Sequence, residues 1–150
     1  MNPPYDILTT IRQTIKFYES LLKEVCREHG LTQLEVNIIS FLHNNPGRDT
    51  AADIVELRML PKGNVSQGVE ALIQKSLLQR QQDADDRRRI HLTLTPKALP
   101  AVKKIETCKD EFYCRLFAGF SLEERDTYIR LHQRIVENTS RGLEEHNHHA

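Results

Sequence analysis

The amino-acid sequence predicts a mainly helical protein that carries one small antiparallel β-hairpin. Over most of the chain, apolar residues recur at steps of three and four, the period of a helix that buries one face. Only Ile90–Leu94 alternates strictly, with three apolar side chains on one side and His91 and Thr93 on the other, as in a half-buried strand. The length of 150 residues fits one domain, residues 1–150, with one core.

Two helices are predicted in the first third of the chain. The first covers residues 5–29, where helical apolar spacing is uninterrupted by Gly or Pro, and Gly30 follows as a stop signal. The second begins at Thr32, which forms a capping box with Glu35, and ends before a turn signal at residues 45–47.

Two shorter helices come next. Thr50 can cap a short third helix, and after a break a fourth helix covers Pro61–Lys75, with proline at its start. The fourth helix has an apolar core face, whereas Gly63 and Gln67 lie on the opposite face. Glu70 lies near that opposite face and adds a negative charge to it.

The hairpin pairs Leu77–Gln82 with the alternating segment, and its tip, residues 83–89, reads DADDRRR. A further long helix starts at residues 95–96, a Thr-Pro signal, and reaches about residue 119. Pro100 falls early in this helix and is expected to bend or delay its first regular turn.

The last helix opens on a second capping box, formed by Ser121 and Glu124, and runs to about Arg141. Residues 142–150 show no apolar periodicity, so they are predicted to form a disordered tail.

Three helices followed by a hairpin predict a winged helix-turn-helix over residues 31–95. The long helices on either side, residues 5–29 and 96–141, are surplus to that unit, and their apolar stripes need partners. A second copy of the chain is the simplest cover, so these helices are predicted to form a homodimer.

Composition excludes several classes of protein. The chain has 21 basic and 21 acidic residues, which argues against a strongly basic, non-specific coat for nucleic acid. The segment from Pro61 to His91 is locally positive, with six cations and four anions. No apolar run is long enough to cross a bilayer, and the N-terminal residues lack a signal pattern, so a cytoplasmic location without membrane contact is expected.

The sequence contains no motif typical of catalysis or of metal binding. Three cysteines show no metal-ligand spacing, and they are interpreted as small buried hydrophobes of a reducing compartment rather than as redox sensors. No phosphate-binding loop or nucleophile motif is present. We therefore predict neither an enzyme nor a cofactor, a catalytic residue or a metal site.

The start of the fourth helix is suited to DNA. Free backbone N–H groups and the positive end of the helix dipole attract phosphate. Asn64 and Gln67 are side chains that pair with adenine in the major groove, whereas Lys62 and Ser66 are expected to contact phosphate. Gly63 belongs to the same exposed set. Taken alone, this is also the pattern of an ordinary amphipathic helix with a solvated face, but the arginine-tipped hairpin that follows favours DNA.

The hairpin tip places Arg87, Arg88 and Arg89 next to one another. A charged tip that only keeps a strand edge soluble explains the acids, but it does not explain three adjacent arginines. Arginines at such a tip are suited to reaching into a groove of double-stranded DNA.

Four motifs resemble the MarR family of transcriptional regulators. The family's opening L-T-x-x-E/Q matches Leu31–Glu35. The pattern L-x-x-x-G-L-V/I-x-R is fitted by Leu72–Arg80, with Ser76 in place of glycine and Leu78 at the V/I position. The wing pattern D-x-x-D-R-R matches Asp83–Arg88, and L-x-L-T-x-K matches Leu92–Lys97. Two further positions depart from the family: Ala98 stands where glycine is expected, and Gln67 stands where a cation is common. The neighbour of Gln67 is Gly68, a weak helix former.

The resemblance implies a homodimeric DNA-binding regulator, most often a repressor, on a pseudo-palindromic operator. It also implies that Asp86 orients one arginine through a salt bridge while another arginine enters the minor groove. We assign the groove to Arg88 and place Arg87 and Arg89 nearer the phosphates. A small-molecule effector held between the dimer helices and the winged unit is a further implication, with pocket residues that the sequence leaves unknown. The alternative is a winged-helix module that binds another protein without specific DNA binding, and it predicts little salt dependence on duplex DNA.

Overall fold

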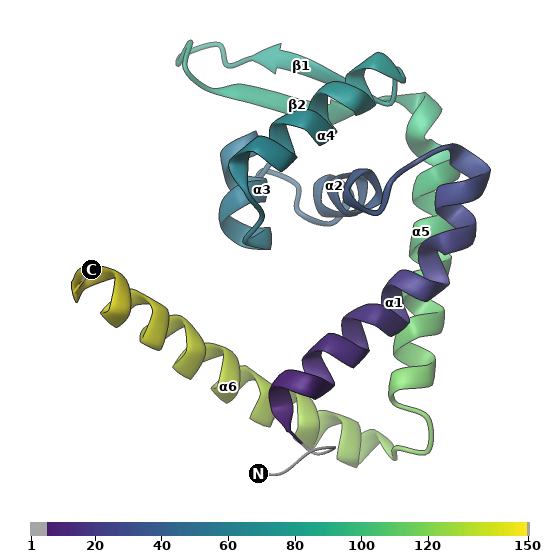
Figure 1. Cartoon of the computed structure of the whole chain (residues 1–150), viewed down its shortest axis with the longest axis vertical. Coiled ribbons are helices and arrows are strands. Elements are labelled where there is room, and N and C mark those ends of the chain that lie inside the picture. The colour runs from purple at the N-terminus through teal and green to yellow at the C-terminus, as the bar shows by residue number, and fades with distance from the viewer. Residues whose placement is uncertain (1–5, 150) are drawn as a thin grey trace. The chain divides into compact units, whose positions relative to one another are not determined.

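A computed structural model describes residues 6–149 of the chain. Its elements, in chain order, are α1 (Ile7–His29), α2 (Gln33–Asn44), α3 (Ala51–Arg58), α4 (Lys62–Gln74), β1 (Leu78–Gln82), β2 (Ile90–Leu94), the 3₁₀ turn η1 (Pro96–Ala98), α5 (Leu99–Leu116) and α6 (Leu122–His149) (Figure 1). The predicted fold class, mainly helical with one antiparallel hairpin, is confirmed. The chain forms two compact units that divide between Phe112 and Tyr113, and each is described by itself.

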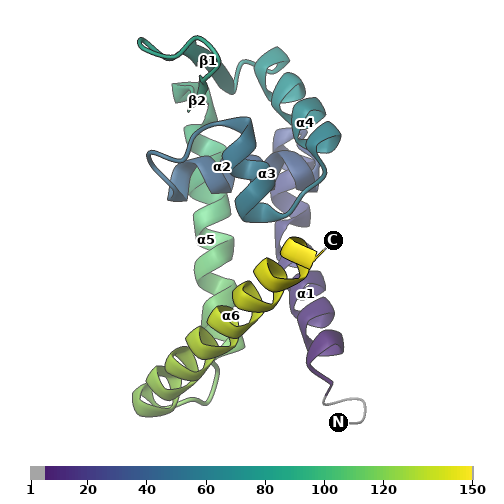
Figure 2. The same cartoon turned by 90° about the vertical axis from the view of Figure 1, so that its left-hand side faces the viewer.

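The core of the first unit lies among α2, α3 and α4, which pack beneath the hairpin (Figures 1 and 2). Phe41, Ile38, Ile54 and Leu72 are among its largest fully buried side chains. This arrangement is that of a winged helix-turn-helix. Because apolar burial on this scale is the main stabilising term in folding, the core fixes α4 against α2.

α1 and α5 extend from the same core and pack on each other. Lys104 Nζ on α5 lies 2.9 Å from Glu28 Oε2 on α1. Phe112 near the end of α5 packs against Phe17 and Tyr18 of α1, with ring centroids 5.6 and 5.1 Å apart and the rings tilted to one another.

Local signals set the helix ends where the sequence predicts them. Gly30 ends α1 in the left-handed conformation at φ +61°, which glycine adopts without strain. Thr32 and Glu35 form the predicted capping box at α2, and Thr50 forms a second one with Asp53 at α3. Met59 ends α3 at φ +52°, a conformation that costs a side chain some strain.

Gly68 in α4 is explained by close packing. A Cβ atom at this position would lie 2.6 Å from Ile38 Cδ1 of α2 and 3.4 Å from Leu34 Cδ2. Glycine is a weak helix former, so a glycine in mid-helix is costly unless the backbone must approach a neighbour. Here it lets α4 lie close against α2.

The hairpin is a regular antiparallel pair, in register from Leu78 opposite Leu94 to Gln82 opposite Ile90. The backbone N–H of Leu92 donates to the carbonyl of Asp49 at 2.8 Å, so the loop between α2 and α3 lies along the free edge of β2. The hairpin is thereby joined to the helices through main chain as well as through its buried base.

Some predicted bounds need correction. β1 begins at Leu78 rather than Leu77, and residue 5, which the first helix was predicted to include, lies outside the described residues. The turn before α5 is 3₁₀, in agreement with the delay expected from Pro100, and α5 ends at Leu116 rather than near residue 119.

The disordered tail is the largest correction. Residues 142–149 continue α6 to His149, and residue 150 lies outside the described residues. The physical reason is local. After Gly142, the sequence Leu-Glu-Glu contains good helix formers, and no proline follows to end the helix.

The second unit consists of the end of α5 and α6. Ser121 and Glu124 form the predicted capping box at the start of α6, with amide contacts of 2.9 and 3.0 Å. Phe117 packs its ring against Phe120 and Tyr128. α6 has no buried residue. None of the helices within residues 6–149 combines the length and apolar composition that a membrane span requires.

Candidate nucleic-acid interface

The start of α4 presents the five DNA-contacting residues that were predicted on this helix. Val65, Gly68 and Val69 face the core and are buried. The other residues at the start of the helix are exposed, and these are Lys62, Gly63, Asn64, Ser66 and Gln67. Pro61 supplies no side-chain cap, so the first N–H groups of α4 are not occupied by a capping side chain. The arrangement offers backbone donors and a positive dipole to a phosphate.

A shallow hollow separates α4 from the hairpin. It has a volume of about 250 Å³ and is lined by Ala51, Ser66, Val69, Glu70, Arg80, Ile90 and Leu92. Glu70 of α4 forms an ion pair with Arg80 of β1 across this hollow. The negative charge that Glu70 brings to the exposed face is therefore neutralised by the hairpin itself, a pairing that sequence spacing does not reveal.

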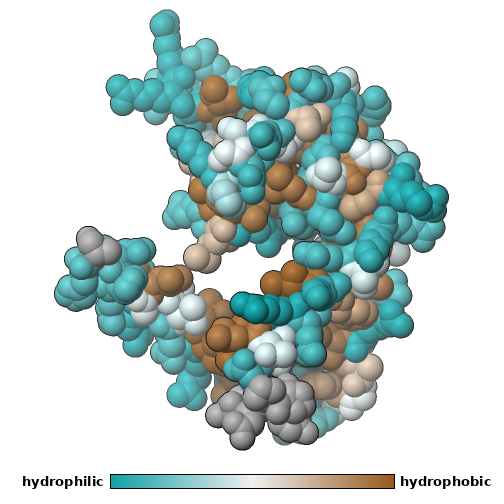
Figure 3. All heavy atoms as spheres, in the orientation of Figure 1, coloured by the Kyte–Doolittle hydropathy of each residue, from teal (hydrophilic) through white to brown (hydrophobic). Residues whose placement is uncertain are grey.

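The tip of the hairpin, residues 83–89, projects from the molecule and is hydrophilic (Figure 3, upper left). Arg87, Arg88 and Arg89 are exposed, and within residues 6–149 none of the three forms an ion pair. Their charges are thus available to an external anion such as the DNA backbone.

The acids of the tip organise its backbone instead of pairing with arginines. Asp83 Oδ1 accepts from the amides of Asp85 and Asp86, at 2.9 and 3.0 Å. Asp86 Oδ1 accepts from the amide of Arg88 at 2.9 Å, and within the described part of the chain it pairs with no arginine side chain. The predicted Asp86 salt bridge is therefore not formed. The short side chain of an aspartate can accept hydrogen bonds from backbone amides two or three residues further along the chain, and this favours a local turn.

His91 is a further residue of this region, and no sequence pattern assigns it a role. Its Nδ1 lies 2.7 Å from Asp49 Oδ1, and its Nε2 lies 2.7 Å from Asp83 Oδ2. Both hydrogen bonds raise the pKa of His91, and the bond to Asp49 makes the larger contribution. The bond from His91 and the amides of Asp85 and Asp86 lower the pKa of Asp83 to about 2. Asp49 lies 42 residues before His91, so only the fold brings the pair together.

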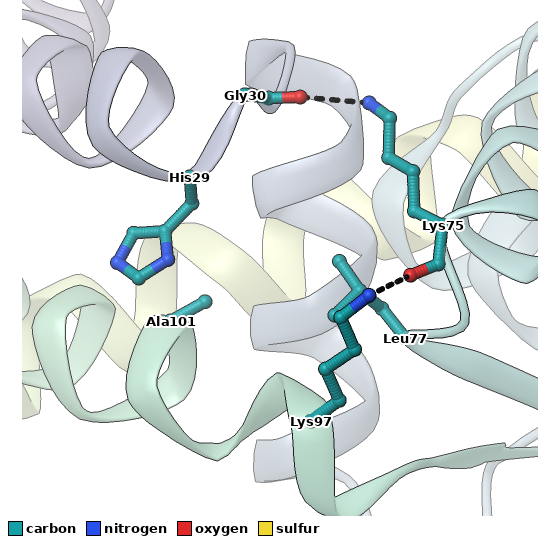
Figure 4. Close-up of a pocket in the computed structure, with 6 residues that line it drawn as sticks. All are labelled: His29, Gly30, Lys75, Leu77, Lys97 and Ala101. Atoms are coloured by element: carbon teal, nitrogen blue, oxygen red, sulfur yellow. Dashed lines mark hydrogen bonds between the residues drawn. The ribbon is translucent and has the colours of Figure 1, made fainter.

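A second hollow, of about 340 Å³, lies where α1 ends and α5 begins (Figure 4). Its lining residues are His29, Gly30, Lys75, Leu77, Lys97 and Ala101. Lys75 Nζ donates to the carbonyl of Gly30 at 2.8 Å and to Glu35 Oε2 at 2.7 Å. Lys97 Nζ donates to the carbonyl of Lys75 at 3.2 Å, whereas the buried Nε2 of His29 has no partner within the described residues.

Metal ligands and thiols are the remaining reactive groups among residues 6–149. Residues 6–149 hold no group of three or more His, Cys, Asp or Glu side chains arranged for a metal ion. Burial raises the pKa of the Cys26 and Cys108 thiols, which disfavours the reactive thiolate. Cys114 is exposed.

Comparison with known proteins agrees with the local geometry. Residues 29–89 match a family model described as the MarR family. Over 105 residues, the chain is 30% identical to the uncharacterized HTH-type transcriptional regulator YkoM of Bacillus subtilis. The matched segment covers 70% of this chain and 68% of that protein.

Solved structures share the fold. A crystal structure of MarR is similar with a TM-score of 0.77 at 19% identity, over 97% of this chain and 98% of that one. The regulator BpsR of Bordetella bronchiseptica, whose DNA binding is regulated by 6-hydroxynicotinic acid, is similar with a TM-score of 0.68 at 20% identity, over 87% and 98% of the two chains. At these identities the structural likeness concerns the fold alone.

Proposed function

Because this chain belongs to the MarR family of transcriptional regulators, we propose that it is a homodimeric repressor of a pseudo-palindromic DNA operator. It is a transcriptional regulator with a DNA-binding fold and not an enzyme. One observation carries the proposal: the exposed start of α4 and three unpaired arginines at the hairpin tip belong to one compact unit. The cytoplasmic location expected from the sequence is part of the proposal.

Each subunit places residues 61–75 in a major groove and residues 83–89 against the adjacent minor groove. Asn64 and Gln67 read bases, whereas Lys62 and Ser66 contact phosphate beside the backbone at Gly63. In the minor groove, Arg88 is inserted and its neighbours Arg87 and Arg89 lie nearer the phosphates. Half-sites lie about one helical turn apart, because the two recognition helices of a dimer meet successive major grooves.

The homodimer is supported by apolar surface on the helices outside the winged unit. α1 exposes Ile7, Leu8, Ile11 and Ile15, with between 48% and 65% of each side chain accessible. α6 exposes its own apolar residues, which are Leu122, Tyr128, Ile129, Leu131, Ile135, Val136 and Leu143. Exposed apolar surface of this kind marks an interaction site, and a second copy of the chain covers it symmetrically. We retain residues 5–29 and 96–141 as the dimerisation helices on this ground.

Response to a small molecule is supported by the hollow beside Lys75 and Lys97 and by the effector of BpsR. The hollow borders both α1 and the winged unit, which is the predicted place for an effector. A ligand there regulates DNA binding only if its affinity differs between the DNA-competent and incompetent conformations.

The decisive experiment is selection of bound duplexes from a random pool at fixed salt. We expect a two-fold-symmetric site, and we expect affinity for it to fall steeply with salt, because phosphate contacts release counterions. The alternative, a module that binds another protein, predicts no enriched duplex and a flat salt response. Either of these two results would reject the repressor proposal.

A further inference from the structure

His91 joins three parts of the winged unit at one imidazole ring. It stands in β2, and it bridges Asp83, at the end of β1, to Asp49, in the loop between α2 and α3. Both contacts are 2.7 Å long, and about a quarter of the His91 side chain is exposed (27%). Ionised carboxylates only accept hydrogen bonds, whereas a neutral imidazole donates from only one nitrogen. Two such contacts therefore require the doubly protonated ring.

The other hydrogen bonds of the tip stay within the hairpin: the Asp83 amide donates to the Arg89 carbonyl at 2.9 Å, the Arg89 amide to the Asp86 carbonyl at 3.1 Å, and Gln82 Nε2 to the Arg87 carbonyl at 3.2 Å. The bridge matters because it joins the tip to the loop before α3. Residues 84–89 are exposed, so apolar burial does not fix them. Asp83 Oδ1 gathers the amides of Asp85 and Asp86, while its Oδ2 is occupied by His91. The same carboxylate thus shapes the tip and anchors it. Through Asp49, the anchor reaches the loop that leads into α3.

We propose that protonated His91 is a positioning residue that holds the arginine tip in register with α4, so that DNA affinity falls when the ring loses its proton. The proposal rests on the proposed function, in which Arg88 and its neighbours contact DNA. His91 itself need not touch DNA, because it acts through the position of the tip.

The charges around His91 set the direction of the pH effect. Asp49 and Arg48 lie on the facing loop, and Asp83 directly follows β1. Asp53 at the start of α3 pairs with Arg48 at 3.4 Å. Gln81, opposite His91 in β1, is uncharged. Arg89 acts on Asp53 rather than on the ring. The two nearest charges are therefore both negative.

Because the pKa of His91 is raised above 6.5, the bridge is complete below that pH and is lost as pH rises through the raised value. Asp83, whose pKa is lowered from 3.8 to about 2, keeps its charge at every pH at which the ring titrates. Alkaline loss of the bridge is thus a property of His91 alone.

Three variants separate this role from general effects of charge. Asp83→Asn keeps an oxygen for the amides of Asp85 and Asp86, but its NH₂ group donates to Nε2 and so accepts a neutral ring. The bridge in this variant needs no extra proton. His91→Gln carries both of its N–H donors on one nitrogen, so it cannot span the two carboxylates as the ring does, and it does not titrate. Asp85→Asn removes the same charge as Asp83→Asn, but the Asp85 side chain takes no part in the bridge, and it serves as the matched control.

The test measures the affinity of each full-length variant for the selected symmetric duplex at about pH 6 and about pH 8.5, at constant ionic strength. For the wild type and Asp85→Asn we expect affinity to fall about fivefold or more across this range, a typical size for coupling between sites. Asp83→Asn should show little change. His91→Gln should bind weakly at both values, near the alkaline level of the wild type.

NMR titration of the His91 ring in the protein without DNA completes the experiment. We expect the pKa of the His91 ring to lie above the ordinary value for histidine. In Asp83→Asn we expect this pKa to return toward the ordinary value. Equal pH profiles for the wild type and His91→Gln, or an unshifted ring, would overturn the proposal. If the ring titrates as expected but Arg88→Ala binds DNA like the wild type, the contact of the tip with DNA is wrong, and the failure lies in the proposed function.

Discussion

α4 and the hairpin tip are the two parts of the winged unit that face the proposed DNA, and they are held in opposite ways. α4 buries four residues, Val65, Gly68, Val69 and Leu72, against the core. The tip buries none, and its shape depends on carboxylates, backbone amides and one histidine. Apolar burial is insensitive to pH, whereas a bridge of ionised groups is not. The difference implies that solution conditions regulate the tip while the helix stays fixed.

Removing apolar support from α4 should have the largest effect. Leu72 is fully buried, and Leu72→Ala deletes core volume and leaves a cavity. We expect the free energy of unfolding to fall by about 2–5 kcal/mol, measured by urea denaturation. Leu57→Ala is the matched control, because Leu57 is 47% exposed. A loss no larger than that of the control would mean that α4 is not held by the core.

Removing a tip charge should leave the fold intact and weaken DNA binding. Arg88→Ala is expected to lower affinity for the selected duplex by about 1–3 kcal/mol without changing the unfolding midpoint. Arg27→Ala, which removes an equal charge from the exposed Glu24 pair on α1, should bind almost normally. Wild-type affinity for Arg88→Ala at moderate salt would refute the assignment of Arg88 to the minor groove.

The end of α4 is also held by a polar contact. Lys75 pairs with Glu35, which is only 4% exposed, and caps the carbonyl of Gly30. Although burial opposes ionisation, the hydrogen bonds from Lys75 and Thr32 outweigh it and lower the pKa of Glu35.

Lys75→Met should therefore cost about 1.5–3 kcal/mol of stability, to a similar extent at about pH 6 and about pH 8.5. In the wild type, the contribution of Glu35 is present above its ordinary pKa of 4.5 and is lost as pH falls through the lowered value. Urea denaturation of the wild type and of Lys75→Met at about pH 6 and about pH 8.5 checks the prediction. A cost that changes between these two pH values would mean that a group at this end of α4 titrates between them.

The smallest effect is expected at Gln67. Gln67→Ala should alter the preferred sequence of selected duplexes more than the affinity for them, because a base contact carries sequence information and a phosphate contact does not. Selections with both proteins at one salt concentration provide the comparison. A uniform loss of affinity over all sequences would identify Gln67 as a backbone contact.

The parts of the structure that could be predicted from the sequence depend on neighbouring residues. The capping boxes at Thr32 and Ser121 and the stop at Gly30 are local, and their positions are confirmed. The exposed start of α4 follows from a helical period over a few turns. The assignment of individual residues to base, phosphate or minor groove remains a prediction.

The contacts that escaped prediction join distant residues. The pairing of Glu70 with Arg80, the bridge from His91 to Asp49 and the close approach of Gly68 to Ile38 each depend on how elements cross. Asp86 was assigned by family resemblance, but a nearby amide of the tip binds its carboxylate instead.

The ion pair between Glu70 and Arg80 also affects the search for an operator. It neutralises one cation on the face that we propose for DNA binding, in a chain whose formal net charge is zero. Affinity for arbitrary sequence comes almost entirely from such cations. A regulator with few of them spends little time on the wrong DNA, dissociates quickly from it and samples many sites. Its selectivity is obtained by weakening the competitors as much as by strengthening the operator.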